Sequence, residues 1–197
     1  MRMLRLNKNY WEDKYKQGDL KWDIGYISTP LREYFDQLTN KNKYILIPGS
    51  GNAYEAEYLY NLGFLNTYVL DWSNEVVKSF KRRCPQFPDE NVIEEDFFAH
   101  NAKYDLIVEQ TFFCAIEPEL RPDYARKVSE LLNTGGKLVG LLFNVELNND
   151  RPPYGGFKEE YVKYFDPYFD FNNFETAYNS IIPRQGRELF INLTKKA

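Results

Sequence analysis

Residues 44–71 constrain the fold more than any other part of the chain. They predict four elements in succession, which are a strand over 44–47, a glycine turn over 48–51, a helix over about 53–62 and a second strand over 67–70. A Gly-x-Gly turn, here Gly49 and Gly51, lets a ligand come close to the backbone at the carboxyl end of a strand. Asp71 stands about 20 residues later, where a carboxylate can accept the hydroxyl protons of a ribose. The unit predicts a nucleoside-cofactor site, with an ordinary strand-to-helix turn as the alternative for this segment alone.

The choice of cofactor rests on the residues that follow the glycine turn. A dinucleotide fingerprint needs a third glycine, so that the helix packs closely and receives a pyrophosphate, but Tyr54 occupies that position. The helix start carries Glu55 and Glu57 and no basic residue, and acid near a helix N-terminus disfavours an anionic ligand. A cofactor without phosphate fits better, and S-adenosyl-L-methionine is the adenosine cofactor of that kind. A nicotinamide-dependent oxidoreductase is the alternative.

Beyond Asp71 the sequence continues as alternating strands and helices. We expect the further elements to be strands over 91–96, 104–109 and 137–143 and helices over 76–83, 118–132 and 158–165. Such alternation predicts a mostly parallel sheet with helices on both faces. Two last strands, over 171–182 and 188–193, are joined by so short a link that they must be antiparallel. The expected fold class is α/β, a Rossmann-like seven-stranded sheet with a C-terminal antiparallel hairpin, which resembles class I methyltransferases.

Length and charge limit the classes of function. A chain of 197 residues suits a single domain. A formal net charge of −4, without a dense basic face, argues against nucleic acid as a partner and leaves a small molecule as the expected one. No apolar run approaches the roughly 20 residues that a membrane-spanning helix needs, so no membrane partner is expected. The oligomeric state cannot be derived from the sequence, and a monomer is the simplest expectation.

The cysteines and the histidine point to a reducing compartment and away from metal chemistry. Only Cys84 and Cys114 are present, too few for a disulfide framework, so the cytoplasm is the expected location. His100 is the only histidine and the cysteines lack ligand spacing, so no metal site is predicted. We expect His100 to be a surface or loop residue and Cys114 to be a buried apolar thiol.

One segment moves the interpretation from a fold class to a family. Residues 112–122, Phe-Phe-Cys-Ala-Ile-Glu-Pro-Glu-Leu-Arg-Pro, resemble the thiopurine/halide/thiol methyltransferase family, especially its plant and bacterial branch. Four other blocks match in register, which are Trp11 with residues 22–25, residues 47–51, residues 152–154 and residues 184–188. The resemblance extends from about residue 11 to residue 188. It implies methyl transfer from S-adenosyl-L-methionine to a small sulfur or halide nucleophile, such as a thiol, hydrosulfide, thiocyanate, iodide or a thiopurine-like compound.

The resemblance also implies an N-terminal lid. Residues 1–40 would form a helical lid region over a sheet core of residues 41–197, and Trp11, Tyr15 and Trp22 would cover the cofactor and the acceptor. A ring beside the sulfonium could stabilise it by a cation–π contact. The alternative is that these rings form a stripe that simply packs a helix onto the sheet.

Residues at strand ends would hold the cofactor, according to the same resemblance. Gly49 and Gly51 would pass under its methionine portion, and Asp71 would hold its ribose. The Asp96 carboxylate would accept a hydrogen bond from the adenine amino group, with the ring of Phe97 packed nearby. These positions agree with the rule that ligands lie beyond the carboxyl ends of parallel strands.

The acceptor side is expected at the end of the fourth strand. Glu109 would lie near the methionine end of the cofactor, and Gln110, Phe113 and Arg184 are the acceptor-side candidates. Phe112 and Phe113 are expected to be divided between the core and the pocket wall, and Arg184 could attract an anion or simply occupy a turn. A soft, ionised acceptor needs no general base at neutral pH, so no catalytic residue is predicted.

Departures from the family pattern gather on the acceptor side. Gln110 stands where the halide branch usually has tyrosine, Asn144 where many members have proline, and Asp150-Arg151 where two glycines are usual. Ala53 replaces a further glycine of the turn. The departures leave the acceptor open more than the cofactor, and a non-catalytic module that binds S-adenosyl-L-methionine is a further alternative.

Overall fold

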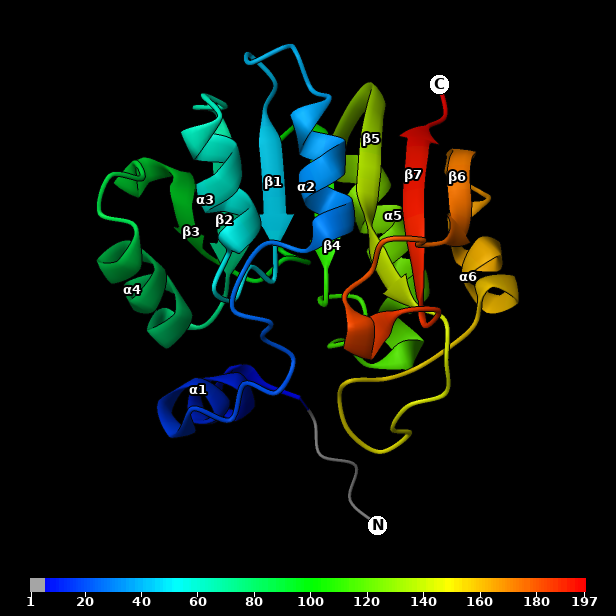
Figure 1. The fold of residues 1–197 in the computed structure, drawn as a ribbon, viewed down its shortest axis with the longest axis horizontal. Helices are drawn as coiled ribbons and strands as arrows, with labels where there is room; N and C mark the ends of the chain where they lie inside the picture. Colours follow the sequence, from blue (N-terminus) through cyan, green and yellow to red (C-terminus); the bar gives the residue numbers. More distant parts are fainter. Residues whose placement is uncertain (1–5) are drawn as a thin grey trace.

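A computed structural model describes residues 6–197, which form a seven-stranded sheet with helices on both faces (Figure 1). Residues 1–5 of the expected lid lie outside the described residues. The strands are β1 (Ile45–Pro48), β2 (Thr67–Asp71), β3 (Val92–Glu94), β4 (Tyr104–Gln110), β5 (Leu132–Phe143), β6 (Phe169–Thr176) and β7 (Glu188–Lys195). Their order in the sheet is β3-β2-β1-β4-β5-β7-β6. This confirms the predicted fold class.

The strand order creates a crevice beside β1. β1 pairs in parallel with β2 on one side and with β4 on the other. The chain builds outward from β1 to β3 and then returns to place β4 beside β1. In doubly wound sheets, ligands bind outside the carboxyl ends of the strands at such a reversal. At the other side of the sheet, β7 lies between β5 and β6 and is antiparallel to both, which confirms the predicted hairpin.

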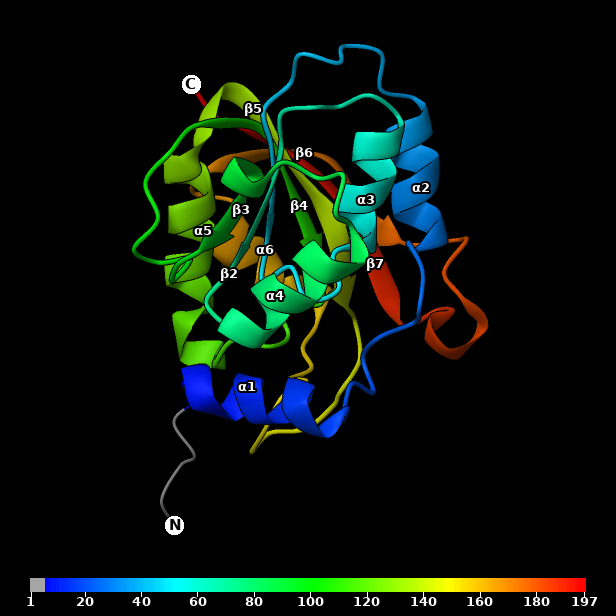
Figure 2. The ribbon, with the colours of Figure 1, turned by 90° about the vertical axis from the view of Figure 1, so that its left-hand side faces the viewer.

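Alternating side chains of the parallel strands bury both faces of the sheet. Ile45 and Ile47 of β1 pack with α2 (Thr29–Asp36), α3 (Tyr54–Asn61) and α4 (Asn74–Arg83). Leu46 points to the opposite face, into a cluster with α5 (Arg121–Leu131) and α6 (Lys158–Phe165) (Figures 1 and 2). Burial on both faces explains why β1 is apolar at successive positions instead of at alternate ones. Within residues 6–197, every helix is too short or too polar to span a lipid bilayer.

Two element boundaries differ most from the prediction. Helix α5 ends at Leu131 and β5 begins at Leu132, although the strand was expected only from residue 137. Gly135, at φ +72°, and a register shift opposite Tyr104 bend β5 at a bulge, so the glycine pair lies inside the strand instead of ending the helix. β6 ends at Thr176, not at residue 182, because the chain continues as a loop with a single 3-10 turn, Ile182–Arg184.

Helix α1 (Lys8–Gln17) lies apart from the two helical layers. Figures 1 and 2 both show it across the end of the sheet toward which β1 and β4 point. The side chain of Asn7 accepts a hydrogen bond from the Tyr10 amide, at 3.0 Å, and Gly18 ends the helix in the left-handed region at φ +67°. No side chain of α1 is fully buried in the core. The helix therefore covers the crevice without being part of either core layer.

Candidate active site beneath helix α1

A cavity of about 520 Å³ opens at the carboxyl ends of the parallel strands. Its wall joins α1, the glycine turn, the ends of β2 and β4, and the loop that contains Asn148 and Arg151. The predicted site residues that line it are Trp11, Tyr15, Trp22, Gly49, Gly51, Asp71, Asp96, Phe97 and Gln110. Glu109, Phe113 and Arg184 do not line it, and their positions are described below.

The glycine turn brings the backbone to the cavity surface. Gly49 and Gly51 have φ angles of +56° and +53°, which side chains rarely adopt. A Cβ atom at Gly49 would collide with the ring of Phe112, and one at Gly51 would lie 2.6 Å from the hydroxyl of Tyr15. Ala53 also has a left-handed φ, +49°, at the position where the family pattern has glycine. Glycine at both positions therefore keeps the turn free of side chains that would meet Phe112 and Tyr15 in the cavity wall.

Asp71 ends β2 directly beside the glycine turn. One carboxylate oxygen accepts from the Gly51 amide at 3.2 Å and the other from the Ser73 amide at 2.9 Å. Burial raises the pKa of the Asp71 carboxyl to about 6, and these two amides oppose that effect. At neutral pH the group is therefore an ionised, pre-oriented acceptor, which suits the two hydroxyl groups of a ribose.

The loop after β3 supplies Asp96 and two phenylalanines. The Asp96 carboxylate accepts from the Phe98 amide at 2.9 Å and remains exposed to the cavity. Phe97 is buried and meets the Phe112 ring edge-on at 5.3 Å between centroids. The loop thus offers an acceptor beside aromatic rings, the combination that adenine requires.

His100 lies in the loop after β3, one of the two positions expected for it, but it is buried and not on the surface. Only 6% of its surface is exposed. One ring nitrogen lies 2.6 Å from the Glu95 carboxylate and the other 2.8 Å from the Tyr104 hydroxyl. Both nitrogens have partners within the fold and the ring does not line the cavity. His100 therefore fixes the end of the loop that carries Asp96.

Aromatic rings of the lid pack against one another over the cavity. The Trp22 ring meets Trp11 edge-on at 5.6 Å between centroids and Tyr15 at 6.1 Å. Asp23 accepts hydrogen bonds from the side chains of Asn52 and Tyr54, which join the lid to the glycine turn. The rings do not pack on a face of the sheet, as the alternative reading supposed, because they line the cavity instead.

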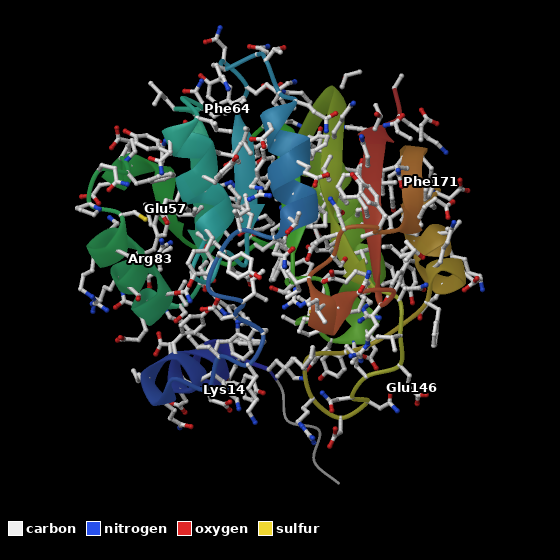
Figure 3. All side chains as sticks on the ribbon, viewed as in Figure 1. Lys14, Glu57, Phe64, Arg83, Glu146 and Phe171 are labelled. Atoms are coloured by element: carbon white, nitrogen blue, oxygen red, sulfur yellow. The ribbon has the colours of Figure 1, made fainter. Side chains whose placement is uncertain are left out.

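Arg83, the last residue of α4, holds the glycine turn in place. Its guanidinium bonds the Asn52 carbonyl and the Glu57 carboxylate, and it lies 4.8 Å from the centre of the Tyr54 ring. Figure 3 shows Arg83 of α4 and Glu57 of α3 side by side. The basic end of α4 is thus partly committed to holding the turn and is not simply solvated.

Glu109 does not contact the cavity, although the resemblance implied a place near the cofactor. Its carboxylate is fully buried and accepts from the Phe112 amide at 2.8 Å, the Phe113 amide at 2.9 Å and the Tyr124 hydroxyl at 2.5 Å. Burial raises its pKa to about 7. These contacts hold the turn that follows β4, so the group is an internal support of the site.

Two acceptor-side candidates are also placed elsewhere. Phe113 belongs to the core, where its ring meets Tyr161 edge-on at 5.2 Å between centroids. Arg184 is buried and donates to the Glu188 carboxylate and to the Trp22 carbonyl. Neither side chain lines the cavity. Gln110 does line it, and its side-chain oxygen is buried without a hydrogen-bond partner within residues 6–197.

Several wall residues were not singled out from the sequence as site residues. They are Trp72, Phe98, Ile116, Pro152 and Pro153. Trp72 directly follows Asp71, so its position after a parallel strand was an available signal. Cys114 also lines the cavity and is buried, as expected, and burial raises its thiol pKa to about 12, so it is not a nucleophile at neutral pH.

Comparisons with known proteins agree with this geometry. A model of the family described as Thiopurine S-methyltransferase (TPMT) matches residues 6–195. "Probable thiol methyltransferase 2" of Arabidopsis thaliana is 30% identical over 185 residues, which cover 90% of this chain and 81% of that protein. "Thiocyanate methyltransferase 1" of Brassica oleracea is 28% identical over 186 residues, with coverage of 90% and 81%.

The comparison of folds identifies the class of protein, and the comparison of sequences identifies the family. The crystal structure of Burkholderia thailandensis 1,6-didemethyltoxoflavin-N1-methyltransferase, with bound 1,6-didemethyltoxoflavin and S-adenosylhomocysteine, superposes with a TM-score of 0.77 at 13% identity. The match covers 96% of this chain and 87% of that one. The fold is that of a class I methyltransferase dependent on S-adenosyl-L-methionine. The chain belongs to the thiopurine S-methyltransferase family, and S-adenosyl-L-methionine is its cofactor.

Proposed function

We propose that this enzyme transfers the methyl group of S-adenosyl-L-methionine to a small sulfur or halide nucleophile, such as a thiol, hydrosulfide, thiocyanate, iodide or a thiopurine-like compound. The observation that carries the proposal is the apolar lining at the acceptor end of the cavity, which is the end formed by the residues after β4. Phe112, Cys114 and Ile116 make it apolar, the thiol is protonated at neutral pH, and His100 does not line the cavity. A nucleophile that is already ionised needs no base, so this wall is sufficient for it.

Residues of this chain fit the cofactor at three points. Gly49 and Gly51 would lie under its methionine portion, because side chains there would fill the space. Asp71 would accept from the ribose hydroxyls, and Asp96, beside Phe97, from the adenine amino group. When bound, the cofactor supplies an activated methyl group on a sulfonium.

The reaction is an in-line displacement. A bond forms between the nucleophile and the methyl carbon while the bond from that carbon to sulfur breaks, and the electron pair stays on sulfur. The protein aligns the two reactants and excludes water, and alignment can supply roughly 7–11 kcal/mol of the barrier. Trp11, Tyr15 and Trp22 would exclude water from above, and Gln110, which lines the cavity at the end of β4, would lie on the acceptor side.

The same proposal covers the working form of the protein. The chain would act as a single domain and as a monomer, on small molecules and not on nucleic acid, since its formal net charge is −4. Cys84 and Cys114 are free and buried, which suits a reducing cytoplasm.

An acceptor panel with methyl-labelled cofactor tests the proposal. We expect label in the volatile products of hydrosulfide, thiocyanate, iodide or a small thiol, or in a methylated thiopurine. S-adenosylhomocysteine binding measured by calorimetry on the same preparation is the control. Tight binding with no labelled product from any of these acceptors would instead identify a non-catalytic binding module.

A further inference from the structure

Arg184 lies outside the cavity yet bonds directly to the lid. It ends the 3-10 turn Ile182–Arg184 in the connection between β6 and β7, and only 9% of its surface is exposed. One guanidinium nitrogen donates to the Trp22 carbonyl at 2.7 Å, a contact that spans 162 residues of sequence. Another donates to the Glu188 carboxylate at 3.2 Å. The forked head thus links the lid to the first residue of β7.

The surroundings of Arg184 make this link rigid. Glu188 is 3% exposed and, in the sheet, pairs with Phe143 of β5. The guanidinium also lies 5.5 Å from the centre of the Phe143 ring. A planar, forked donor can bond a carboxylate and a carbonyl at the same time, which a lysine ammonium does less well. Through Arg184, the carbonyl of Trp22 is therefore fixed relative to β7 and its neighbour β5.

The other polar ties between residues 8–23 of the lid and the sheet core lack a buried, charged donor. Lys8 pairs with Glu94 at 2.7 Å, but both side chains are more than a third exposed, and exposed ion pairs contribute little. The Asp23 contacts to Asn52 and Tyr54 are part-buried, as the Arg184–Trp22 contact is, but their donors carry no charge. The Arg184 contact is the one in which the donor is buried and its charge is paired.

Fixing Trp22 fixes the rings that depend on it. Trp11 and Tyr15 both meet the Trp22 ring edge-on, and the Tyr15 hydroxyl lies over Gly51. If Trp22 moves, the three rings lose their order above the glycine turn, which we assign to the cofactor. Because the rings are already ordered before the ligand arrives, the entropy cost of binding is lower.

We propose that Arg184 is a positioning residue that latches the lid closed by holding the Trp22 carbonyl against β7. The inference rests on the proposed function only in assigning the cavity to the cofactor. Of the two alternatives for Arg184, it takes up the residue in a turn and gives that turn a role.

Two variants test the latch while avoiding an unpaired buried charge. Arg184→Gln combined with Glu188→Gln removes both charges and shortens the donor, and Arg184→Lys keeps the charge but loses the fork. Arg187→Gln, an exposed neighbour in the same connection, is the matched control. In the double variant we expect the Kd for S-adenosylhomocysteine to rise on the order of fivefold to tenfold, with a smaller rise in Arg184→Lys and none in Arg187→Gln.

Two readouts on the ligand-free protein make the test independent of activity. All three tryptophans of the chain, Trp11, Trp22 and Trp72, line the cavity, so a released lid should shift their fluorescence to longer wavelength. Trypsin should also cleave faster at Lys14 and Lys16 of α1. Unchanged emission, cleavage and Kd in the double variant would overturn the latch, as would equal changes in the Arg187 control. If wild-type protein bound no S-adenosylhomocysteine, the function would fail, while emission and cleavage would still decide the latch.

Discussion

Replacing Asp71 with asparagine removes one charge from the centre of the cofactor site at almost constant volume. The carboxylate holds two backbone amides, those of Gly51 and Ser73, at 3.2 and 2.9 Å. Its remaining lone pairs face the cavity that we assign to the ribose. The asparagine variant keeps one oxygen acceptor, but its amide nitrogen offers donors where the ribose hydroxyls would donate.

The expected loss follows from the strength of charge-assisted hydrogen bonds. A hydrogen bond to a charged group contributes about 1.5–3 kcal/mol. Losing one such bond predicts a rise of roughly 10- to 100-fold in the Kd for S-adenosylhomocysteine. Asp71→Ala, which removes both oxygens, should weaken binding by more than about tenfold as well, with an additional loss of stability because two backbone amides lose their partner.

The pH dependence adds a signature that a general structural defect would not produce. The carboxyl pKa is raised to about 6 by burial, and ribose hydroxyls that donate to the ionised form lower it on binding. Wild-type affinity should therefore fall as the pH drops below about 6, because the proton must then be released on binding. The ratio of variant to wild-type Kd should be largest near pH 8 and shrink toward pH 5.

Calorimetric titration with S-adenosylhomocysteine at pH 5, 6, 7 and 8 measures both effects. Asp170→Asn, an exposed acid of β6, is the matched control and should bind like wild type. An Asp71→Asn affinity within twofold of wild type at pH 8 would refute the ribose assignment. A ratio that stays constant across the pH range would refute the reasoning about its charge.

Other substitutions test the supports of the site. Gly49→Ala should lower the Tm and weaken S-adenosylhomocysteine binding, because it costs about 1–2 kcal/mol in the left-handed region and also displaces Phe112; a variant that melts and binds like wild type would contradict this. Glu109→Ala should lower the free energy of unfolding by about 3 kcal/mol or more in urea titrations, because it leaves the Phe112 and Phe113 amides and the buried Tyr124 hydroxyl without this partner. Glu109→Gln can keep those contacts and should cost far less, so equal losses in the two variants would rule out this role. The free energy of unfolding of the wild type should fall as the pH rises from about 5 to 8. Burial raises the pKa of Glu55 and of Glu109 to about 7, so the folded state binds more protons than the unfolded state in that range; a rise in stability would have the wrong sign.

The backbone-determined part of the site could be read from the sequence. Gly49, Gly51 and Asp71 occupy the turn and the strand end at which the chain must reverse, so their place at the crevice follows from topology. Asp96 follows a strand end in the same way. The antiparallel hairpin was predictable because the link between its strands leaves no room for a crossover helix.

Side-chain direction could not be read in the same way. Glu109 also lies near a strand end, but its carboxylate turns inward to the amides of Phe112 and Phe113. His100 is buried because Glu95 and Tyr104 satisfy both ring nitrogens, and a single histidine in a polar loop gives no sign of such partners. The partner of Arg184 is a backbone carbonyl in a distant segment, which carries no sequence signal.

A crystal structure of the complex with S-adenosylhomocysteine tests the central claim most directly. The account predicts ribose hydroxyls within about 2.6–3.2 Å of the Asp71 carboxylate and the homocysteine portion against Gly49 and Gly51. Its sulfur should face the apolar wall formed by Phe112 and Ile116. A nucleoside bound elsewhere on the molecule, or a cavity that stays filled by Tyr15 and Trp22 at saturating ligand, would contradict it.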